Sequence, residues 1–355
     1  MNQVKNREMK KMGSLYEERF IYDEIKQEGF PFAHCSNITE IDENTLVAQW
    51  YTGKGEQARN QSIFAARFDR TSDLWSEPYL LSKTTEYPEG NGIIWKHPKL
   101  NKLFLFYAVM VTHNPLKKMF GRGWKHCKLY YKISKDDGGT WSKPYTLKKE
   151  LNYMIRNKPI VLDSGRILLP MYMEEPTQGL MGISDDDGEN FFFTPVIQDD
   201  PDKYPSKGFW FVQSGSHQPT VAQLGDGRIL ALFRTTLHKR IFYSLSQDDG
   251  DTWSPARALD LPNPDSGIDM VRLDSGRLVL LFNNTESGRH DISVAAADEA
   301  DFKDWTVIKN IEHDSKKKFS YPAIIKTRDG IMHATYTYDR KKIKHISFNE
   351  EWLDE

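Results

Sequence analysis

Two histidines and a group of arginines in this sequence have the types and positions that acid–base chemistry on an anion needs. His34 and His217 each stand directly before an apolar segment, at equivalent places in two related stretches of the chain. A histidine exchanges protons near neutral pH, which suits a general base. Arg156, Arg234 and Arg289 carry planar guanidinium groups, which bind carboxylate or sulfate through paired hydrogen bonds. The combination predicts a site for an anionic ligand.

Further candidates share one feature: they lie where apolar segments begin or end. Those at the beginnings are His34, Trp95, His97, Arg156, Asn157, Lys158, His217, Gln218, Ser320 and Tyr321. Those at the ends, or just beyond, are Trp50, Tyr51, Glu174, Glu175, Arg234, Asn283, Asn284, Arg289, Tyr338 and Arg340. Cations outnumber acids in this set although the chain has a formal net charge of −2, so we expect the ligand to be acidic.

Two other interpretations of the histidines are open. A histidine at a strand end is commonly a hydrogen-bonded structural residue. His34, His97 and His217 could instead hold a metal ion, but they come from separate segments without the short spacing of ligand motifs. We therefore predict no metal and no cofactor.

The segments that would position these residues recur along the chain. Residues 216–255 contain four short apolar runs separated by Asp/Gly turns, a pattern typical of antiparallel strands joined by hairpins. The first half of this pattern appears six times, starting at Asn37, His97, Lys158, Gln218, Gly267 and Tyr321. Six units of about 59 residues predict an all-β, six-bladed β-propeller, with seven blades as the alternative. Glu18–Ile25 is expected to add an outer strand to the last blade and to close the ring.

A second motif, Ser-x-Asp-x-Gly-x-Thr-Trp, belongs to the same units. It is complete at Ser134–Trp141 and Ser246–Trp253 and degenerate at Ser184–Phe191. Its aspartates suggest metal binding or catalysis at first sight. Each one falls in a hairpin turn, however, where an aspartate accepts backbone N–H bonds. We predict a structural role for these Asp boxes.

Propeller geometry separates the loops into two faces. The first-to-second turns and the Asp boxes share one face, which we call the Asp-box face. The second-to-third loops and the crossovers between blades share the other, the crossover face. Two long segments, residues 112–128 and 198–217, fall on the crossover face, where function is expected to concentrate. They contribute Lys117, Lys118, Arg122, Lys125 and the sugar-stacking candidates Trp124 and Trp210.

Composition narrows the class of protein. A hydrophobic content of 39% is enough for one large core, so we expect a tail at residues 1–16 and a single propeller domain at residues 17–355. The near-neutral charge gives no reason to expect nucleic acid or membrane as a partner. The first residues contain no apolar run of the signal-peptide kind, and Cys35 and Cys127 fall in different repeats. Both features favour a cytoplasmic location.

The repeats and boxes resemble the sialidase superfamily of six-bladed propellers, in particular the bacterial BNR-repeat proteins known as predicted neuraminidases. The resemblance covers nearly the whole chain, from AHCSNITEI through RNKPIVLDSGRILLP, SGSHQPTV and SYPAII to TYTYDRKKIKH. It implies that Arg234 and Arg289 match two of the three arginines with which sialidases bind a carboxylate. It also implies that Tyr321 matches their nucleophile.

Three other positions depart from the sialidase pattern. The first arginine of that family belongs in the stretch Phe32–Ser36, the glutamate partner of the nucleophile at His217–Gln218, and the acid aspartate near Asn60–Ser62. None of these stretches supplies the expected residue, which argues against hydrolysis of sialic acid. Related propellers with a histidine in the first blade are polysaccharide lyases that cut at uronic acids, so the resemblance also implies β-elimination.

β-Elimination needs a cationic clamp on the uronate carboxylate, a base for the C5 proton and a donor for the leaving oxygen. Our hypothesis assigns His34 or His217 as the base and Tyr321 or Tyr338 as the donor. The predicted substrate-binding residues are Trp95, His97, Arg156, Lys158, Gln218, Arg234, Asn283, Arg289 and Arg340.

Two further functions stay open. One is an exo-sialidase-type glycoside hydrolase that uses carboxylates such as Glu174 and Glu175. These two are adjacent on a strand end, so only one of them can face the site. The other is a glycan-binding propeller without catalysis. We expect an acidic oligosaccharide as the partner and neither nucleic acid nor membrane, and the sequence leaves the oligomeric state open.

Overall fold

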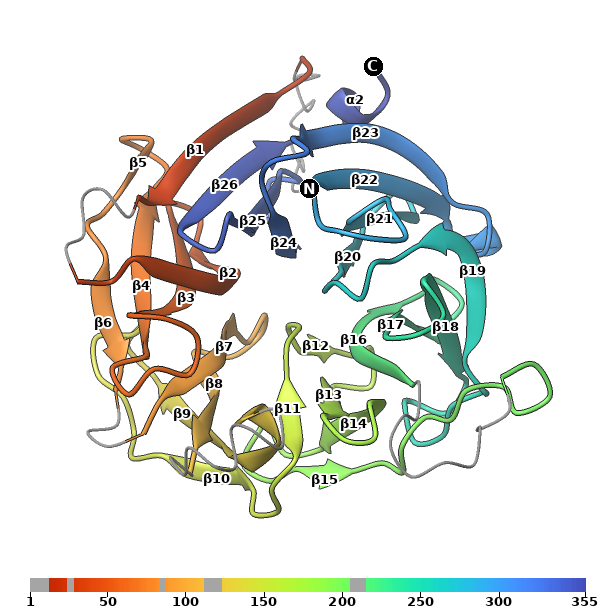
Figure 1. Cartoon of the computed structure of the whole chain (residues 1–355), viewed down its shortest axis with the longest axis horizontal. Coiled ribbons are helices and arrows are strands. Elements are labelled where there is room, and N and C mark those ends of the chain that lie inside the picture. Colours follow the sequence, from red (N-terminus) through yellow and green to blue (C-terminus); the bar gives the residue numbers. More distant parts are fainter. Residues whose placement is uncertain (1–12, 24–28, 84–86, 112–122, 205–214) are drawn as a thin grey trace, which may run out of the picture.

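The computed structural model describes residues 13–23, 29–83, 87–111, 123–204 and 215–355. These residues form six antiparallel sheets arranged radially around a central axis (Figure 1). The predicted six-bladed β-propeller is confirmed. No helix in the described ranges is both long and apolar enough to cross a bilayer.

The first three blades follow one another from the N-terminal side. Blade 1 contains β2 (Phe32–Asp42), β3 (Thr45–Gly53), β4 (Ser62–Asp69), β5 (Leu74–Trp75) and β6 (Tyr79–Ser82). Blade 2 contains β7 (Glu89–Lys96), β8 (Leu103–Met110), β9 (Cys127–Ser134) and β10 (Tyr145–Lys148). Blade 3 contains β11 (Tyr153–Ile155), β12 (Ile160–Val161), β13 (Ile167–Met173), β14 (Gln178–Ser184) and β15 (Phe192–Phe193).

The other three blades complete the ring. Blade 4 contains β16 (Ser216–Gln223), β17 (Ile229–Thr235), β18 (Arg240–Ser246) and β19 (Arg257–Pro262). Blade 5 contains β20 (Asp269–Arg272), β21 (Arg277–Phe282), β22 (Asp291–Asp298) and β23 (Thr306–His313). Blade 6 contains β24 (Phe319–Lys326), β25 (Met332–Tyr338), β26 (Lys342–Phe348) and β1 (Tyr16–Tyr22). The short helices are η2 (Gly123–His126), η3 (Glu299–Asp301) and α2 (Glu350–Leu353).

The N-terminal strand closes the ring as predicted. β1 pairs antiparallel with β26 and lies beside it in Figure 1, although the two strands are at opposite ends of the sequence. The strand begins at Tyr16, two residues before the predicted start, and the Tyr16 ring stacks on Trp352 with centroids 4.7 Å apart. Closure leaves the sixth sheet with no missing strand at its outer edge.

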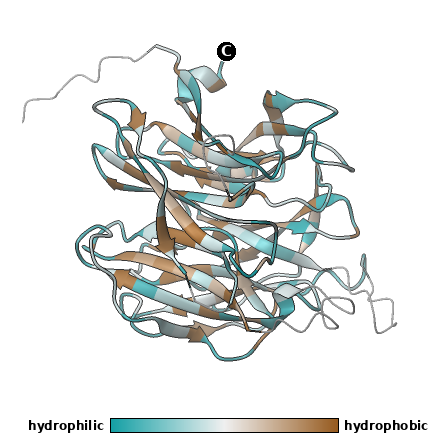
Figure 2. Ribbon diagram, turned by 60° about the vertical axis from the view of Figure 1, so that its left-hand side comes forward, coloured by the Kyte–Doolittle hydropathy of each residue, from teal (hydrophilic) through white to brown (hydrophobic). Residues whose placement is uncertain are grey.

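Burial on both faces explains the composition of the middle strands. Every residue of β8 and β17 is buried, because each blade packs against a neighbour on either side. Figure 2 shows apolar colour along the strands and hydrophilic colour mainly at the turns. The core is thus a set of layers between blades, and it leaves the loops on the two faces free for function.

The Asp boxes are structural, as predicted. The Ser134 hydroxyl donates to Asp136 at 2.7 Å, and Asp136 accepts from the backbone N–H of Thr140 at 2.8 Å. These hydrogen bonds, led by that from Thr140, lower the pKa of Asp136 to about 2. The degenerate box keeps the same pattern, because the amide of Asn190 takes the place of a threonine hydroxyl and donates to Asp186 at 2.7 Å.

A histidine pair lies buried in blade 6. The rings of His333 and His345 stack with their planes 9° apart, and Nδ1 of His333 lies 3.0 Å from Nε2 of His345. The indole of Trp75 in blade 1 approaches Nδ1 of His345 at 3.3 Å. Burial lowers the pKa of His333 to about 3 and the pKa of His345 well below its usual value. Both rings are therefore neutral in the folded protein at neutral pH.

We expect this pair to make the protein sensitive to acid. Below pH about 6.5 the unfolded chain binds protons that the folded chain excludes, so each ring should lower the free energy of unfolding by ~1.4 kcal/mol per pH unit. Urea unfolding at pH 7.5 and pH 5.5 measures this loss. His333→Gln should reduce the difference between the two pH values, whereas His290→Gln, at a half-buried position, should leave it unchanged. Equal losses in all three proteins would contradict the prediction.

Candidate functional site

Tyr321 lies near the start of β24, at the crossover face, inside a group of arginines. The guanidinium carbons of Arg156, Arg289 and Arg234 lie 5.1, 5.4 and 5.7 Å from the centre of its ring. The phenol oxygen accepts a hydrogen bond from Arg234 at 2.8 Å. We call these four residues, with His34 and His217 beside them, the Tyr321 cluster. Such an arrangement favours an anionic ligand close to the tyrosine ring.

Bulges in the inner strands bring the cluster together. In blades 1, 2, 4 and 6 the register of the inner strand shifts near its start, at Cys35, Asn91, Gln218 and Tyr321. Each of these residues has a positive φ, between 46° and 59°. A bulge interrupts the strict alternation of a strand and re-aims its side chains. The neighbours His217 and Gln218 can therefore both contact Arg234.

Arg234, at the end of β17, is the centre of the hydrogen-bond network. It donates to Nε2 of His217 at 3.0 Å and to the amide oxygen of Gln218 at 2.8 Å, in addition to Tyr321. Its remaining nitrogen lies 3.0 Å from the Asp265 carboxylate. Because Nε2 of His217 accepts a hydrogen bond, the ring proton belongs on Nδ1, which lies 3.3 Å from the Gly215 carbonyl. His217 thus holds Arg234 in place.

The other arginines approach from different blades. Arg156 reaches across the ring from blade 3 and donates to the backbone oxygens of Tyr321 and Pro322 at 2.8 and 3.1 Å. Arg289 donates to the Asp265 backbone oxygen at 2.6 Å, and burial lowers its pKa. Its charge is therefore poorly compensated, and an anionic ligand would stabilise it.

Arg340 stands at the edge of the cluster with a carboxylate of its own. It donates to Glu56 at 3.0 Å, and Glu56 also accepts from the indole of Trp124 at 3.1 Å. Among the described residues, the carboxylates in ion pairs with the four arginines are Asp265 and Glu56. Four guanidinium groups thus meet two carboxylates, and the excess charge is positive.

His34 lies against the tyrosine ring. The two rings meet edge to face with centroids 4.8 Å apart, and Nδ1 of His34 lies 3.0 Å from the Thr337 hydroxyl. Burial, followed by the charges of Arg340 and Arg289, holds the pKa of His34 well below its usual value. His34 is therefore uncharged at neutral pH.

Sequence reasoning missed two contributors to the site. The Tyr172 hydroxyl donates to Glu174 at 3.0 Å and accepts from the amide of Gln218 at 3.0 Å, which links blade 3 to Arg234. Asp265, which neutralises part of the Arg234 charge, lies just before the inner strand of blade 5. Asp265 could have been found from the sequence, because it lies just before an inner strand, and a position at the beginning of an inner strand is what identified His34 and His217.

The structure places three predicted residues away from the cluster. The sequence prediction began the inner strand of blade 2 at His97, and that start is wrong, because the inner strand is β7, which ends at Lys96. Trp95 and His97 therefore lie at the Asp-box face. Nδ1 of His97 accepts two backbone N–H bonds from the following turn, a structural role. Lys158 points into the central channel and binds Asp269 at 2.8 Å.

Several other candidates have structural contacts instead. The Tyr338 ring packs edge-on against Phe20 and Phe319, and its hydroxyl accepts from Lys317, so it lies outside the Tyr321 cluster. The buried Asn283 donates to backbone oxygens, including that of Phe319. Strand alternation is the reason: the side chains at these strand ends point between blades.

The crossover-face insertions are described only in part. Trp124 is buried against Tyr51, with ring centroids 5.8 Å apart, and Lys125 pairs with Glu175 at 2.9 Å. Lys117, Lys118, Arg122 and Trp210 lie outside the described residues. Within the described ranges, no group of three or more His, Cys, Asp or Glu side chains could hold a metal ion.

Comparison with protein families identifies the fold family. Residues 44–334 match the model of the BNR repeat-like domain, which is most of the chain. The chain belongs to the BNR repeat-like family. The resemblance to BNR-repeat propellers is thereby confirmed. A comparison with curated proteins gave no match.

Solved structures share the fold of this BNR repeat-like protein at low sequence identity. A protein of unknown function from Dyadobacter fermentans is 16% identical with a TM-score of 0.75, over 95% of this chain and 99% of that one. The NanB sialidase of Streptococcus pneumoniae is 14% identical with a TM-score of 0.73, over 94% and 71%. An α-L-arabinanase of Penicillium chrysogenum is 14% identical with a TM-score of 0.67, over 97% and 99%. At such identities the likeness establishes the propeller fold of the BNR repeat-like protein.

The Tyr172 network leads to a stability prediction for this BNR repeat-like protein. Tyr172→Phe removes the hydroxyl that satisfies the buried Gln218 amide, so the free energy of unfolding should fall by about 1–3 kcal/mol. Urea unfolding monitored by tryptophan fluorescence measures the loss. The control is Tyr145→Phe at an exposed tyrosine, which should have little effect. If both variants match the parent protein, the network does not stabilise the site.

Proposed function

We propose that this protein is a carbohydrate-active enzyme that cleaves a carboxylate-bearing oligosaccharide at Tyr321, by β-elimination. The observation that carries the proposal is the hydrogen bond from Arg234 to the Tyr321 phenol oxygen, inside a ring of three guanidinium groups. The phenol oxygen of a tyrosine held in this way is fixed in position beside the cations that would bind an acidic substrate, where it can exchange a proton with that substrate.

The charge of the cluster supports an acidic substrate. Arg289 is buried, and its side-chain hydrogen bond goes to the Asp265 backbone oxygen. A sugar carboxylate at this position would restore the missing negative charge and would accept paired hydrogen bonds. In a uronic acid this contact would also acidify the C5 proton and stabilise the enolate that forms when the proton leaves.

The proposed reaction assigns each step to a group in the cluster. Deprotonated Tyr321 takes the C5 proton, and the electron pair forms the C4–C5 double bond as the C4–O bond breaks. Tyr321 then returns the proton to the leaving oxygen, so no water is consumed. His217 positions Arg234, because its Nε2 is engaged by that arginine. Neutral His34, with its ring against Tyr321, would orient the substrate at the reacting carbon.

These assignments revise the roles that the sequence suggested for the same residues. The sequence hypothesis gave the base to His34 or His217 and the donor to Tyr321 or Tyr338. The contacts favour Tyr321 for both proton transfers, because His217 already accepts from Arg234 and Tyr338 packs between blades. Arg156, Arg234, Arg289 and Arg340 keep the proposed role of carboxylate clamp.

Hydrolysis of the sialidase type is the second candidate. The match of Tyr321, Arg234 and Arg289 to the sialidase pattern favours it, and Asp265 brings a carboxylate within 3.0 Å of Arg234. In that reaction Tyr321 would attack the anomeric carbon, and a carboxylic acid would protonate the leaving group. The sialidase pattern has a glutamate as the partner of the tyrosine nucleophile. Among the described residues, the group that hydrogen-bonds the Tyr321 hydroxyl is Arg234, which is a cation. Elimination therefore ranks first.

Product masses distinguish these reactions. The protein is incubated with uronate-terminated and sialate-terminated oligosaccharides, and the products are weighed by mass spectrometry. Elimination gives two products whose masses sum to that of the substrate, and hydrolysis adds the mass of one water. We expect elimination of a uronate, with kcat reduced about 10²–10⁴-fold in Tyr321→Phe.

The matched control for that experiment is Tyr338→Phe, which removes a tyrosine hydroxyl outside the cluster and should leave kcat nearly unchanged. A hydrolytic product pair would replace the first candidate by the second. Full activity in Tyr321→Phe would overturn both.

The pH profile tests the role of His34. Because the pKa of His34 lies well below its usual value of about 6.5, His34 stays neutral from pH 8 down through pH 6. Its protonation should therefore not limit kcat/KM in that range, and His34→Gln should lower kcat/KM without changing the shape of the profile. If an acidic limb near pH 6.5 disappears in His34→Gln, His34 titrates in the reaction and the assignment is wrong.

A further inference from the structure

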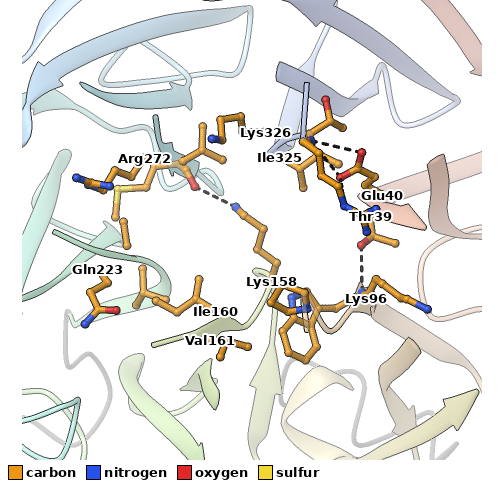
Figure 3. Close-up of a pocket in the computed structure, with 18 of the residues that line it drawn as sticks. Thr39, Glu40, Lys96, Lys158, Ile160, Val161, Gln223, Arg272, Ile325 and Lys326 are labelled. Carbon is orange, nitrogen blue, oxygen red and sulfur yellow. Dashed lines mark hydrogen bonds and ion pairs between the residues drawn. The ribbon is translucent and has the colours of Figure 1, made fainter. Parts of the chain in front are cut away.

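A cavity opens at the Asp-box face of the propeller. It has a volume of about 670 Å³ and is lined by residues from the ends of the inner strands (Figure 3). None of the residues of the Tyr321 cluster is among its described lining residues. A cavity of this size holds a small organic molecule.

A buried ion pair forms the inner end of this cavity. The Lys158 ammonium crosses the channel and binds both carboxylate oxygens of Asp269 at 2.8 Å and the Met270 carbonyl at 2.9 Å. Figure 3 shows its side chain extending across the centre of the cavity. Because Asp269 neutralises this lysine, the inner end carries little net charge.

The walls of the cavity are largely apolar, and its rim carries several cations. Apolar side chains are provided by Ile160, Val161, Val221, Met270, Val271 and Ile325. Cations at the outer part are Lys96, Arg272, Lys326 and Arg328, against the carboxylates of Glu40 and Asp163. Each of these cations is in an ion pair, and the partners are Asp137, Glu299, Asp274 and Glu40 in the same order. The cavity therefore offers apolar walls and a rim of cations whose partners a ligand would displace.

Two of the rim cations have partners that an incoming anion can displace. Lys326 pairs with Asp274, whose side chain is 90% exposed, and Arg328 lies 3.7 Å from Glu40 with 63% of its own side chain exposed. Exposed pairs of this kind contribute little to stability. Both cations can therefore turn toward a ligand at low cost.

We propose that this cavity is a second binding site, for a small organic anion with an apolar body. The apolar part enters between the inner strands, and the carboxylate, sulfonate or phosphate group stays at the rim with Lys326 and Arg328. This ligand differs in kind from a sugar acid, whose hydroxyl groups would lack partners along the apolar wall.

A fluorescent probe tests the site in the intact protein. The probe is 8-anilinonaphthalene-1-sulfonate, which carries one sulfonate on an apolar aromatic body and fluoresces when shielded from water. We expect a saturable titration with one site per chain. Lys326→Glu reverses a rim charge and should weaken binding roughly three- to tenfold. Val161→Trp fills the cavity from a half-buried position and should abolish binding.

Two controls separate this site from the Tyr321 cluster. Lys143→Glu makes the same charge reversal at an exposed lysine outside the cavity and should leave the affinity unchanged. Arg289→Gln removes a cation of the cluster and should also leave it unchanged. Binding lost in Arg289→Gln but kept in Val161→Trp would place the probe in the cluster and overturn the proposal. Equal affinity in the parent protein, Lys326→Glu and Val161→Trp, or titration without saturation, would overturn it as well.

Discussion

The carboxylate of Asp269 connects four of the six blades at the centre of the ring. It binds Lys158 of blade 3, accepts from the Thr220 hydroxyl of blade 4 at 2.7 Å, and accepts from the backbone N–H of Ile324 in blade 6 at 2.9 Å. Its own strand is in blade 5. Removing one partner of a buried ion pair typically costs about 3–5 kcal/mol. The Tyr321 cluster depends on this contact, since Arg156 and Tyr321 lie two and three residues upstream of Lys158 and Ile324.

The two ends of the channel carry cations in different ways. At the Asp-box face the lysines and arginines are partly exposed and paired with carboxylates, so their charges cost little folding free energy. At the crossover face Arg289 and Arg234 are buried with fewer carboxylates than charges. A site that is incompletely neutralised lowers the stability of the empty protein, and the ligand recovers that energy when it binds.

The fold could be predicted because turn residues and repeated motifs are visible in short stretches of sequence. The site could not be predicted fully, because bulges change the direction of side chains from the regular alternation of a strand. Turn residues and Asp boxes identified the hairpins, and six repeats gave the ring. The inner strand of blade 2 was missed because it contains Gly90, Asn91 and Gly92 instead of an apolar run. The bulges at Gln218 and Tyr321 changed which side chains meet. Arg234 at the end of a second strand does belong to the site, whereas Tyr338 at the equivalent end of β25 was assigned to the site although it packs between blades.

The pairing of β1 with β26 also sets an order of assembly during synthesis. Among the described strands, the outer strand β1 of blade 6 is made first and its partner β26 (Lys342–Phe348) is made last. While the ribosome produces the five intervening blades, the first strand has no sheet to join and its polar backbone groups must bind water. The ring can close only after β26 has emerged, so the last-made of these strands completes the blade that carries Tyr321.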